Sequence, residues 1–160
     1  NLFFLSAPNS FDGMLLTAVS ADSVKEMLED AAIRFDYLVI DGSEELNNPI
    51  SSLGITMSNK IIRVYRVSTK DCVWYAAMDN LTDLMHIRSK TINVINGYDK
   101  SCDKMAFLNS SGIKPDFELP YIQAAATLSN SGKLIYDSRT VSGQYRKIIE
   151  KIAGQVIAGG

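Results

Sequence analysis

The 160-residue chain has the length of one domain, and its 46% apolar residues can supply a core, which excludes a disordered chain. A formal net charge of −2 gives no overall attraction for nucleic acid, and the two cysteines are too few for a disulfide framework or a metal site. The cysteines fit a reducing cytoplasm, and no apolar run has transmembrane length, so we expect a cytoplasmic single domain over residues 1–160.

The sequence pattern of residues 2–40 predicts a strand, a helix and a second strand. Residues 2–5 form a short apolar run that is typical of a strand. Apolar residues then recur at helical spacing over 23–35, and Ser23 with Glu26 has the spacing of a capping box. The run at 37–40 is apolar without interruption, which predicts a strand buried on both faces of a parallel sheet.

Asp41 and Gly42 follow this predicted strand directly. An acid at the carboxyl end of a buried parallel strand lies where open α/β sheets bind ligands, and there it can hold Mg²⁺ through a water. Asp41 is equally explained as a helix cap or the start of a turn, so its position leaves both interpretations open.

Helices and strands alternate through the rest of the chain. We expect strands at 61–67, 91–97 and 117–120, and helices at about 49–57, 105–110, 122–129 and 142–156. A further helix is expected between the first two of these strands, with an apolar stripe over 74–85. Thr69 or Asp71 is its expected cap, and His86 at its end is expected to be a surface or capping residue. This alternation predicts an α/β fold with a mostly parallel sheet flanked by helices.

Three predicted strands end in candidate site residues, namely Asp41, Asn96 and Pro120. Because the carboxyl ends of parallel strands share one edge of a sheet, we expect these residues to converge there. Asn96 is also explained as a helix N-cap or a turn residue.

Several segments resemble the MinD/ParA family of deviant P-loop ATPases. Residues 35–41, FDYLVID, are similar to the family's acid-ended strand, and residues 92–96, INVIN, to its asparagine-ended strand. Residues 119–133 are similar to its proline-tyrosine segment and the helix that follows it. The opening residues and the final amphipathic helix are also placed as in the family. The resemblance covers nearly the whole chain in the family's order and implies a P-loop NTPase-like, Rossmann-type three-layer fold.

The resemblance implies a role for each matching residue. Asp41 matches the Walker B acid, which is the catalytic and metal-binding residue that positions Mg²⁺ on the phosphates. Asn96 matches the asparagine that hydrogen-bonds the adenine edge, and Leu119 and Pro120 match backbone that lies against the base. The implied cofactors are ATP or ADP with Mg²⁺.

The chain departs from the family pattern at two places. No Gly-x-x-x-x-Gly-Lys-[Ser/Thr] loop occurs in it, and residues 131–134 are not that loop because Thr127 stands where the first glycine is required. In the family this loop lies upstream, so residues 1–160 match the C-terminal portion of the domain, and ATP and Mg²⁺ are expected only with that upstream segment. Glu44 and Glu45 follow Asp41 closely and would repel phosphates, which disfavours turnover.

The turn after Asp41 is most similar to the CpaE/TadZ group of pilus-assembly and polar-localisation proteins. This implies an ATP-binding protein that uses nucleotide-dependent homodimerisation for polar localisation and pilus assembly, with weak or no hydrolysis. Partitioning and division-site ATPases are competing branches, and a non-catalytic receiver-like or scaffold domain is the alternative class. The implied partners are nucleotide, a second copy and pilus or polar-localisation proteins, without direct nucleic acid. The last helix is expected to pack on the sheet, so membrane contact is at most peripheral.

Overall fold

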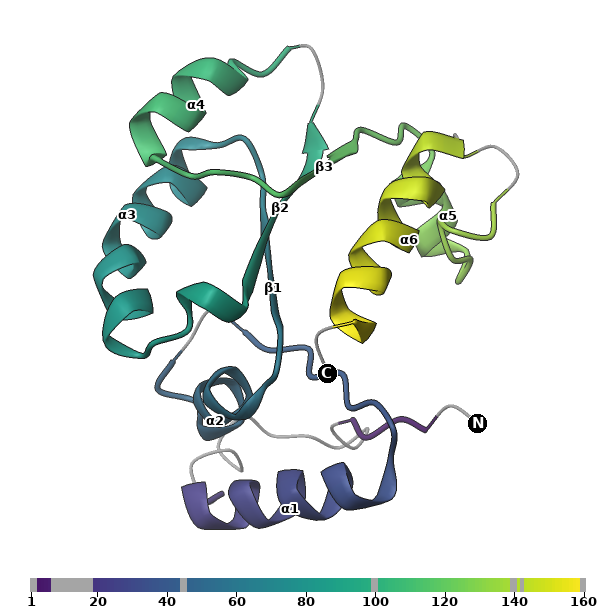
Figure 1. Ribbon diagram of the computed structural model, residues 1–160. Coiled ribbons are helices and arrows are strands. Elements are labelled where there is room, and N and C mark those ends of the chain that lie inside the picture. The colour runs from purple at the N-terminus through teal and green to yellow at the C-terminus, as the bar shows by residue number, and fades with distance from the viewer. Residues whose placement is uncertain are drawn as a thin grey trace. The chain divides into compact units, whose positions relative to one another are not determined.

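The computed structural model describes residues 3–6, 19–43, 46–98, 101–138, 141 and 143–158. The chain divides into two compact units, the N-terminal unit Asn1–Ser58 and the C-terminal unit Asn59–Gly160. Figure 1 shows the elements of both units in chain order. Among the described residues, no helix combines the length and the apolar character needed to span a bilayer.

The N-terminal unit contains helices α1 (Ala21–Arg34) and α2 (Pro49–Met57), which pack together. Ser20 caps α1 because its Oγ accepts the Ser23 N–H at 3.1 Å, so the cap lies three residues before the expected one. At α2, Asn48 Oδ1 accepts the Ile50 N–H at 2.9 Å, as expected for a helix that begins at proline. The polar cap thus fixes the start of each helix.

The expected strand at 37–40 does not form in the N-terminal unit, and neither do residues 3–6 form one. Tyr37 is 64% exposed and Val39 is 91% exposed, so the prediction of a strand buried on both faces is wrong here. A strand needs a neighbour to satisfy its N–H and C=O groups, and none of the described residues forms a ladder with this segment. Only Ile40 is half-buried there, because it packs against Gly54 of α2.

The C-terminal unit is built on a three-stranded parallel sheet in the order β1-β2-β3. Its strands are β1 (Ile61–Tyr65), β2 (Thr91–Tyr98) and β3 (Phe117–Pro120). Its helices are α3 (Thr69–Leu84), a 3-10 turn η2 (Arg88–Lys90), α4 (Lys104–Ser111), α5 (Ala125–Asn130) and α6 (Gly143–Ile157). The predicted α/β class, with helices flanking a parallel sheet, is confirmed.

Each face of the sheet carries its own core, and β2 contributes to both. On one face, where α3 and α4 lie in Figure 1, Tyr65 and Ile95 pack with side chains from those helices. On the other face, Val94 and Leu119 pack with Ile152 of α6. Successive strand residues point to opposite faces, so a central strand covered on both sides needs apolar residues on each face. In β2 these are Ile92, Val94 and Ile95, while Asn93 is half-buried and accepts a hydrogen bond from the Tyr65 hydroxyl.

Helix α3 has a well-defined start and stop. Ser68 caps it, one residue before Thr69 and three before Asp71, which were the two expected caps: its Oγ accepts the Asp71 N–H at 3.1 Å and donates to the Asp71 carboxylate. At the other end His86 has a φ of 53°, and the Ile87 N–H bonds the Thr82 carbonyl at 3.2 Å. This is a Schellman stop with histidine in the left-handed position, which confirms the capping interpretation of His86.

Candidate functional site

The carboxyl ends of β2 and β3 bring three of the four predicted site residues together. Asn96 is the register partner of Leu119, and Tyr98 is the partner of Pro120. Gly97 has a φ of 70° and lies at the register shift between Asn96 and Tyr98, a backbone conformation that glycine adopts without strain. We call residues 96–98 and 119–121 the carboxyl edge.

The Asn96 side chain is a chemically available group of the carboxyl edge. It is exposed, and its amide has no hydrogen-bond partner among the described residues. Leu119 beside it is 6% exposed and packs in the α6-side core, and Pro120 is half-buried. The Asn96 amide, which can both donate and accept hydrogen bonds, therefore lies on β2 beside β3, whose Leu119 is fixed by packing. This arrangement suits recognition of a planar, polar edge such as that of a purine.

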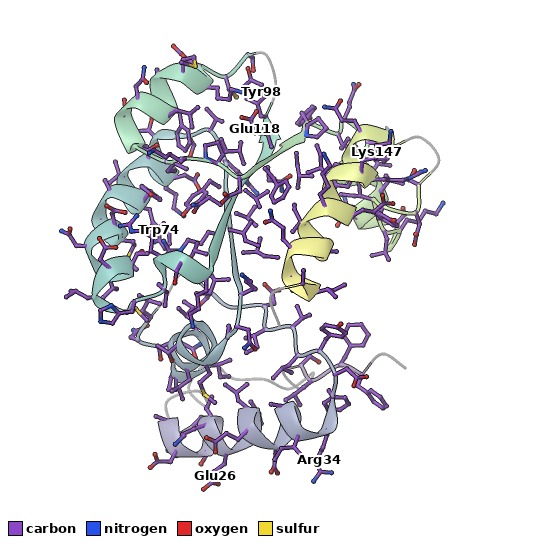
Figure 2. All side chains as sticks on the ribbon, viewed as in Figure 1. Glu26, Arg34, Trp74, Tyr98, Glu118 and Lys147 are labelled. Carbon is purple, nitrogen blue, oxygen red and sulfur yellow. The ribbon has the colours of Figure 1, made fainter. Side chains whose placement is uncertain are left out.

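A charged pair close to the carboxyl edge was not predicted from the sequence. Lys104 Nζ lies 2.8 Å from Glu118 Oε2 and 4.9 Å from the centroid of the Tyr98 ring. The hydrogen bond to Glu118 raises the pKa of the Lys104 ammonium, and burial opposes that shift. Figure 2 shows Tyr98 and Glu118 close together at the top of the sheet. Because the two charges cancel, the pair leaves this part of the edge close to neutral.

Asp41 lies in the N-terminal unit, and Asn96, Leu119 and Pro120 lie together in the C-terminal unit. Asp41 is exposed and follows the unpaired segment 37–40. Next to it, the Ser43 N–H donates to Ser51 Oγ of α2 at 3.1 Å, so the turn after Asp41 is fastened to α2. Within the described ranges there is no group of three or more His, Cys, Asp or Glu side chains that could hold a metal. The acids Glu44 and Glu45 fall outside those ranges.

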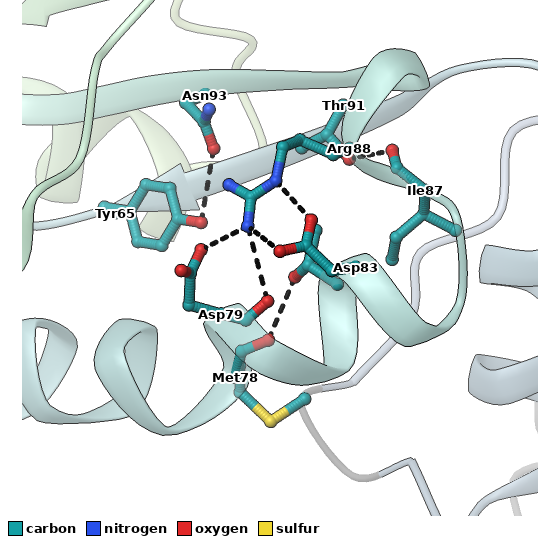
Figure 3. Close-up of polar contacts among 9 residues, drawn as sticks. Tyr65, Met78, Asp79, Asp83, Ile87, Arg88, Thr91 and Asn93 are labelled. Atoms are coloured by element: carbon teal, nitrogen blue, oxygen red, sulfur yellow. Dashed lines mark hydrogen bonds and ion pairs between the residues drawn. The ribbon is translucent and has the colours of Figure 1, made fainter.

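A second polar cluster occupies the opposite end of the sheet, where α3 ends (Figure 3). Arg88 Nε lies 2.5 Å from Asp83 Oδ1, and its Nη2 lies 2.8 Å from Asp79 Oδ1. The hydrogen bond from Arg88 lowers the pKa of the Asp83 carboxyl, and the two carboxylates raise the pKa of the guanidinium. Asn80, Leu84 and the capping His86 line a hollow together with Asp83. Its charges are paired with one another and its histidine serves a helix stop, so we interpret this cluster as structural.

No family model, curated protein or solved structure matches the chain.

Proposed function

We propose that the carboxyl edge binds the base of an adenine nucleotide. The observation that supports this most is the Asn96 side chain: an exposed amide, without a partner among the described residues, held opposite Leu119 where two parallel strands end. In open α/β sheets, ligands bind outside the carboxyl ends of the strands. An amide offers a donor and an acceptor at fixed spacing, which matches the hydrogen-bonding edge of adenine.

The groups at the carboxyl edge are better suited to binding the base of the nucleotide than to binding its phosphates. Lys104 is engaged by Glu118 at 2.8 Å, so its charge is already balanced. The sequence holds no glycine-lysine loop that would cradle phosphates with backbone N–H groups. Asp41 offers a single carboxylate, and a magnesium ion usually keeps several waters and takes its other ligands from the phosphates. We therefore expect this chain alone to bind ATP weakly.

The wider role follows from the resemblance to the MinD/ParA family. Within the proposal, the full protein is a CpaE/TadZ-type, cytoplasmic ATP-binding protein in which nucleotide controls homodimerisation. Its task is polar localisation and pilus assembly, with weak or no hydrolysis. The proposed nucleotide contacts are Asn96, Leu119 and Pro120, and Asp41 is the proposed magnesium residue.

Titration of the chain with ATP, followed by fluorescence or NMR, tests the base site. We expect a dissociation constant on the order of 1 mM, equivalent to about −4 kcal/mol. Asn96→Ala removes the amide and should weaken binding by roughly fivefold, since a hydrogen bond contributes about 1 kcal/mol. Asn80→Ala, at an exposed asparagine of α3, is the matched control and should leave ATP affinity unchanged. Equal effects of the two substitutions would refute the base site, and tight magnesium-dependent binding would refute our view of the absent loop.

A non-catalytic α/β interaction domain is the second candidate, favoured by the exposed apolar residues Ile62 and Val64 of β1. Asp41→Ala separates the two functions. Loss of nucleotide binding or of nucleotide-linked dimerisation supports the ATPase interpretation, because an interaction domain needs no nucleotide. Unchanged behaviour supports the interaction domain.

A further inference from the structure

Lys104, the first residue of α4, is held beside the carboxyl edge by two contacts. Its Nζ donates to Glu118 Oε2 of β3 at 2.8 Å and lies 4.9 Å from the centroid of the Tyr98 ring. All three residues belong to the C-terminal unit. The side chain of Lys104 is 25% exposed and that of Glu118 is 40% exposed. A partly exposed ion pair contributes little to stability, so a stronger anion can replace its acid.

The ion pair adjoins the proposed base site. Glu118 directly precedes Leu119, which is the register partner of Asn96. Neighbouring residues of a strand point to opposite faces of the sheet, so Glu118 faces α4 and Leu119 faces α6. A nucleotide whose base lies at Asn96 would cross the ends of β2 and β3 to bring its phosphates to Lys104.

The turn at Gly97 completes the surroundings of the lysine. Ile95 and Tyr98 both pack in the α3-side core, although they are three positions apart and regular alternation would place them on opposite faces. The φ of 70° at Gly97 accounts for this, because it turns the backbone before Tyr98. The ring of Tyr98 is thereby brought to the ammonium of Lys104 at the end of β2 (Figure 2).

The phosphates of a nucleotide are stronger partners for Lys104 than Glu118 is. An ammonium has three N–H donors, and one of them is engaged with Glu118. A triphosphate carries several negative charges, and charge-assisted hydrogen bonds to phosphate are short and strong. The Glu118 carboxylate would repel phosphates that approach the same ammonium. This acid therefore lowers the affinity for phosphate until it moves away.

We propose that Glu118 is an internal competitor for Lys104: it holds the ammonium in the free chain, and the phosphates of a bound nucleotide displace it. Lys104 then serves as a phosphate ligand in a sequence that holds no glycine-lysine loop. This inference rests on the proposed function for the source of the phosphates. The exchange at Lys104 is nevertheless tested separately with inorganic tripolyphosphate, which carries no base.

Calorimetric titrations of the full chain with tripolyphosphate and with adenosine measure the two halves of the site. Glu118→Gln should strengthen tripolyphosphate binding by roughly fivefold and leave adenosine binding unchanged. Asp137→Asn removes one negative charge from the exposed segment before α6 and is the matched control, which should change neither affinity. If Glu118 only fastens α4 to β3, its substitution lowers stability without a gain in tripolyphosphate affinity, and that result would overturn the proposal. If Glu118→Gln does not fold, as judged by circular dichroism, Glu118→Thr decides, because threonine favours strands.

Combination with Lys104→Met shows whether the gain depends on the lysine. With Lys104→Met already present, Glu118→Gln should change tripolyphosphate affinity by less than about twofold. A gain of equal size with and without Lys104 would mean that Glu118 acts through general repulsion, which contradicts the exchange. Adenosine that does not bind would overturn the proposed function and leave the exchange standing. Adenosine binding without any gain from Glu118→Gln would overturn the exchange and leave the base site standing.

Discussion

Asn96 and Leu119 face each other across two parallel strands at the edge where both strands end. The buried partner, 6% exposed, anchors the pair in the α6-side core, and the exposed partner presents its amide to solvent. Gly97 then breaks the register, so that Tyr98 becomes the partner of Pro120. The fold thus fixes the position of the proposed base-binding group through packing on one side of the sheet.

Gly97→Ala should destabilise the C-terminal unit by about 1 kcal/mol. A Cβ at this position would meet no heavy atom of the described residues within 4 Å, so the cost comes from the φ of 70° and not from a clash. Gly154→Ala, inside α6 and equally free of neighbours, should stabilise by about 1 kcal/mol because alanine favours helices. Urea unfolding, followed by the fluorescence of Trp74, the one tryptophan, measures the free energy of unfolding of both variants. Two changes of the same sign would contradict the backbone argument.

His86→Gly should raise the free energy of unfolding by about 1 kcal/mol, since glycine occupies the left-handed position without the penalty that a Cβ carries. The φ of 53° and the bond from the Ile87 N–H to the Thr82 carbonyl define this helix stop. His86→Ala is the control, because it removes the imidazole and keeps the strained backbone. A gain shared by both variants would show that the imidazole, not the backbone, limits stability.

Ile152→Ala in α6 should lower the free energy of unfolding by about 2–4 kcal/mol. Ile152 is 7% exposed and packs against Val94 and Leu119, so its truncation leaves a cavity under the sheet. Ile157→Ala in the same helix removes a side chain that is 57% exposed and should cost well under 1 kcal/mol. Similar losses at both positions would contradict the orientation of α6.

Stability should fall as pH rises from about 10 to about 12 because of Tyr65. Burial raises the pKa of this phenol to about 12, so over that interval the unfolded chain loses the proton while the folded chain keeps it. The loss is on the order of 2 kcal/mol by pH 12. Tyr65→Phe should flatten this part of the pH profile and cost about 1 kcal/mol or less at pH 8, where the hydroxyl bonds Asn93 at 3.3 Å.

The exposed Tyr121→Phe is the control for this pH profile, and it should leave the alkaline loss of stability in place. A profile that flattens equally in both variants would mean that burial of Tyr65 is not the cause.

Local sequence signals predicted the C-terminal unit well. The apolar run of β2 stops at the turn that Gly97 allows, and Pro120 ends β3, so both strands have nearly the expected bounds. The helix starts were displaced by one to three residues because serine side chains outside the apolar pattern, Ser20 and Ser68, make the caps.

The predicted strand at residues 37–40 does not form, and the cause is different. Residues 37–40 and 92–95 are both rich in apolar side chains, yet Val39 is 91% exposed and Ile95 is fully buried. The difference lies in the neighbours: β2 has a strand on each side, and the segment before Asp41 has none among the described residues. An apolar run predicts that a segment can be buried, but its pairing depends on distant parts of the chain.

The candidate site was predictable only in part. Parallel strands share an edge, so Asn96 could be expected next to Leu119 and Pro120, and the register confirms this. Lys104 and Glu118 are 14 positions apart and meet only because α4 packs on the sheet. No local sequence pattern could therefore predict their ion pair.

The most direct measurement is a map of backbone amide shifts during an ATP titration of the full chain. The account predicts shifts concentrated in residues 96–98, 117–119 and 121, which need several-fold more ATP in Asn96→Ala and are unchanged in Asn80→Ala. Shifts centred on another part of the chain, or an unaltered spectrum at several times the expected dissociation constant of about 1 mM, would contradict a base site at the ends of β2 and β3.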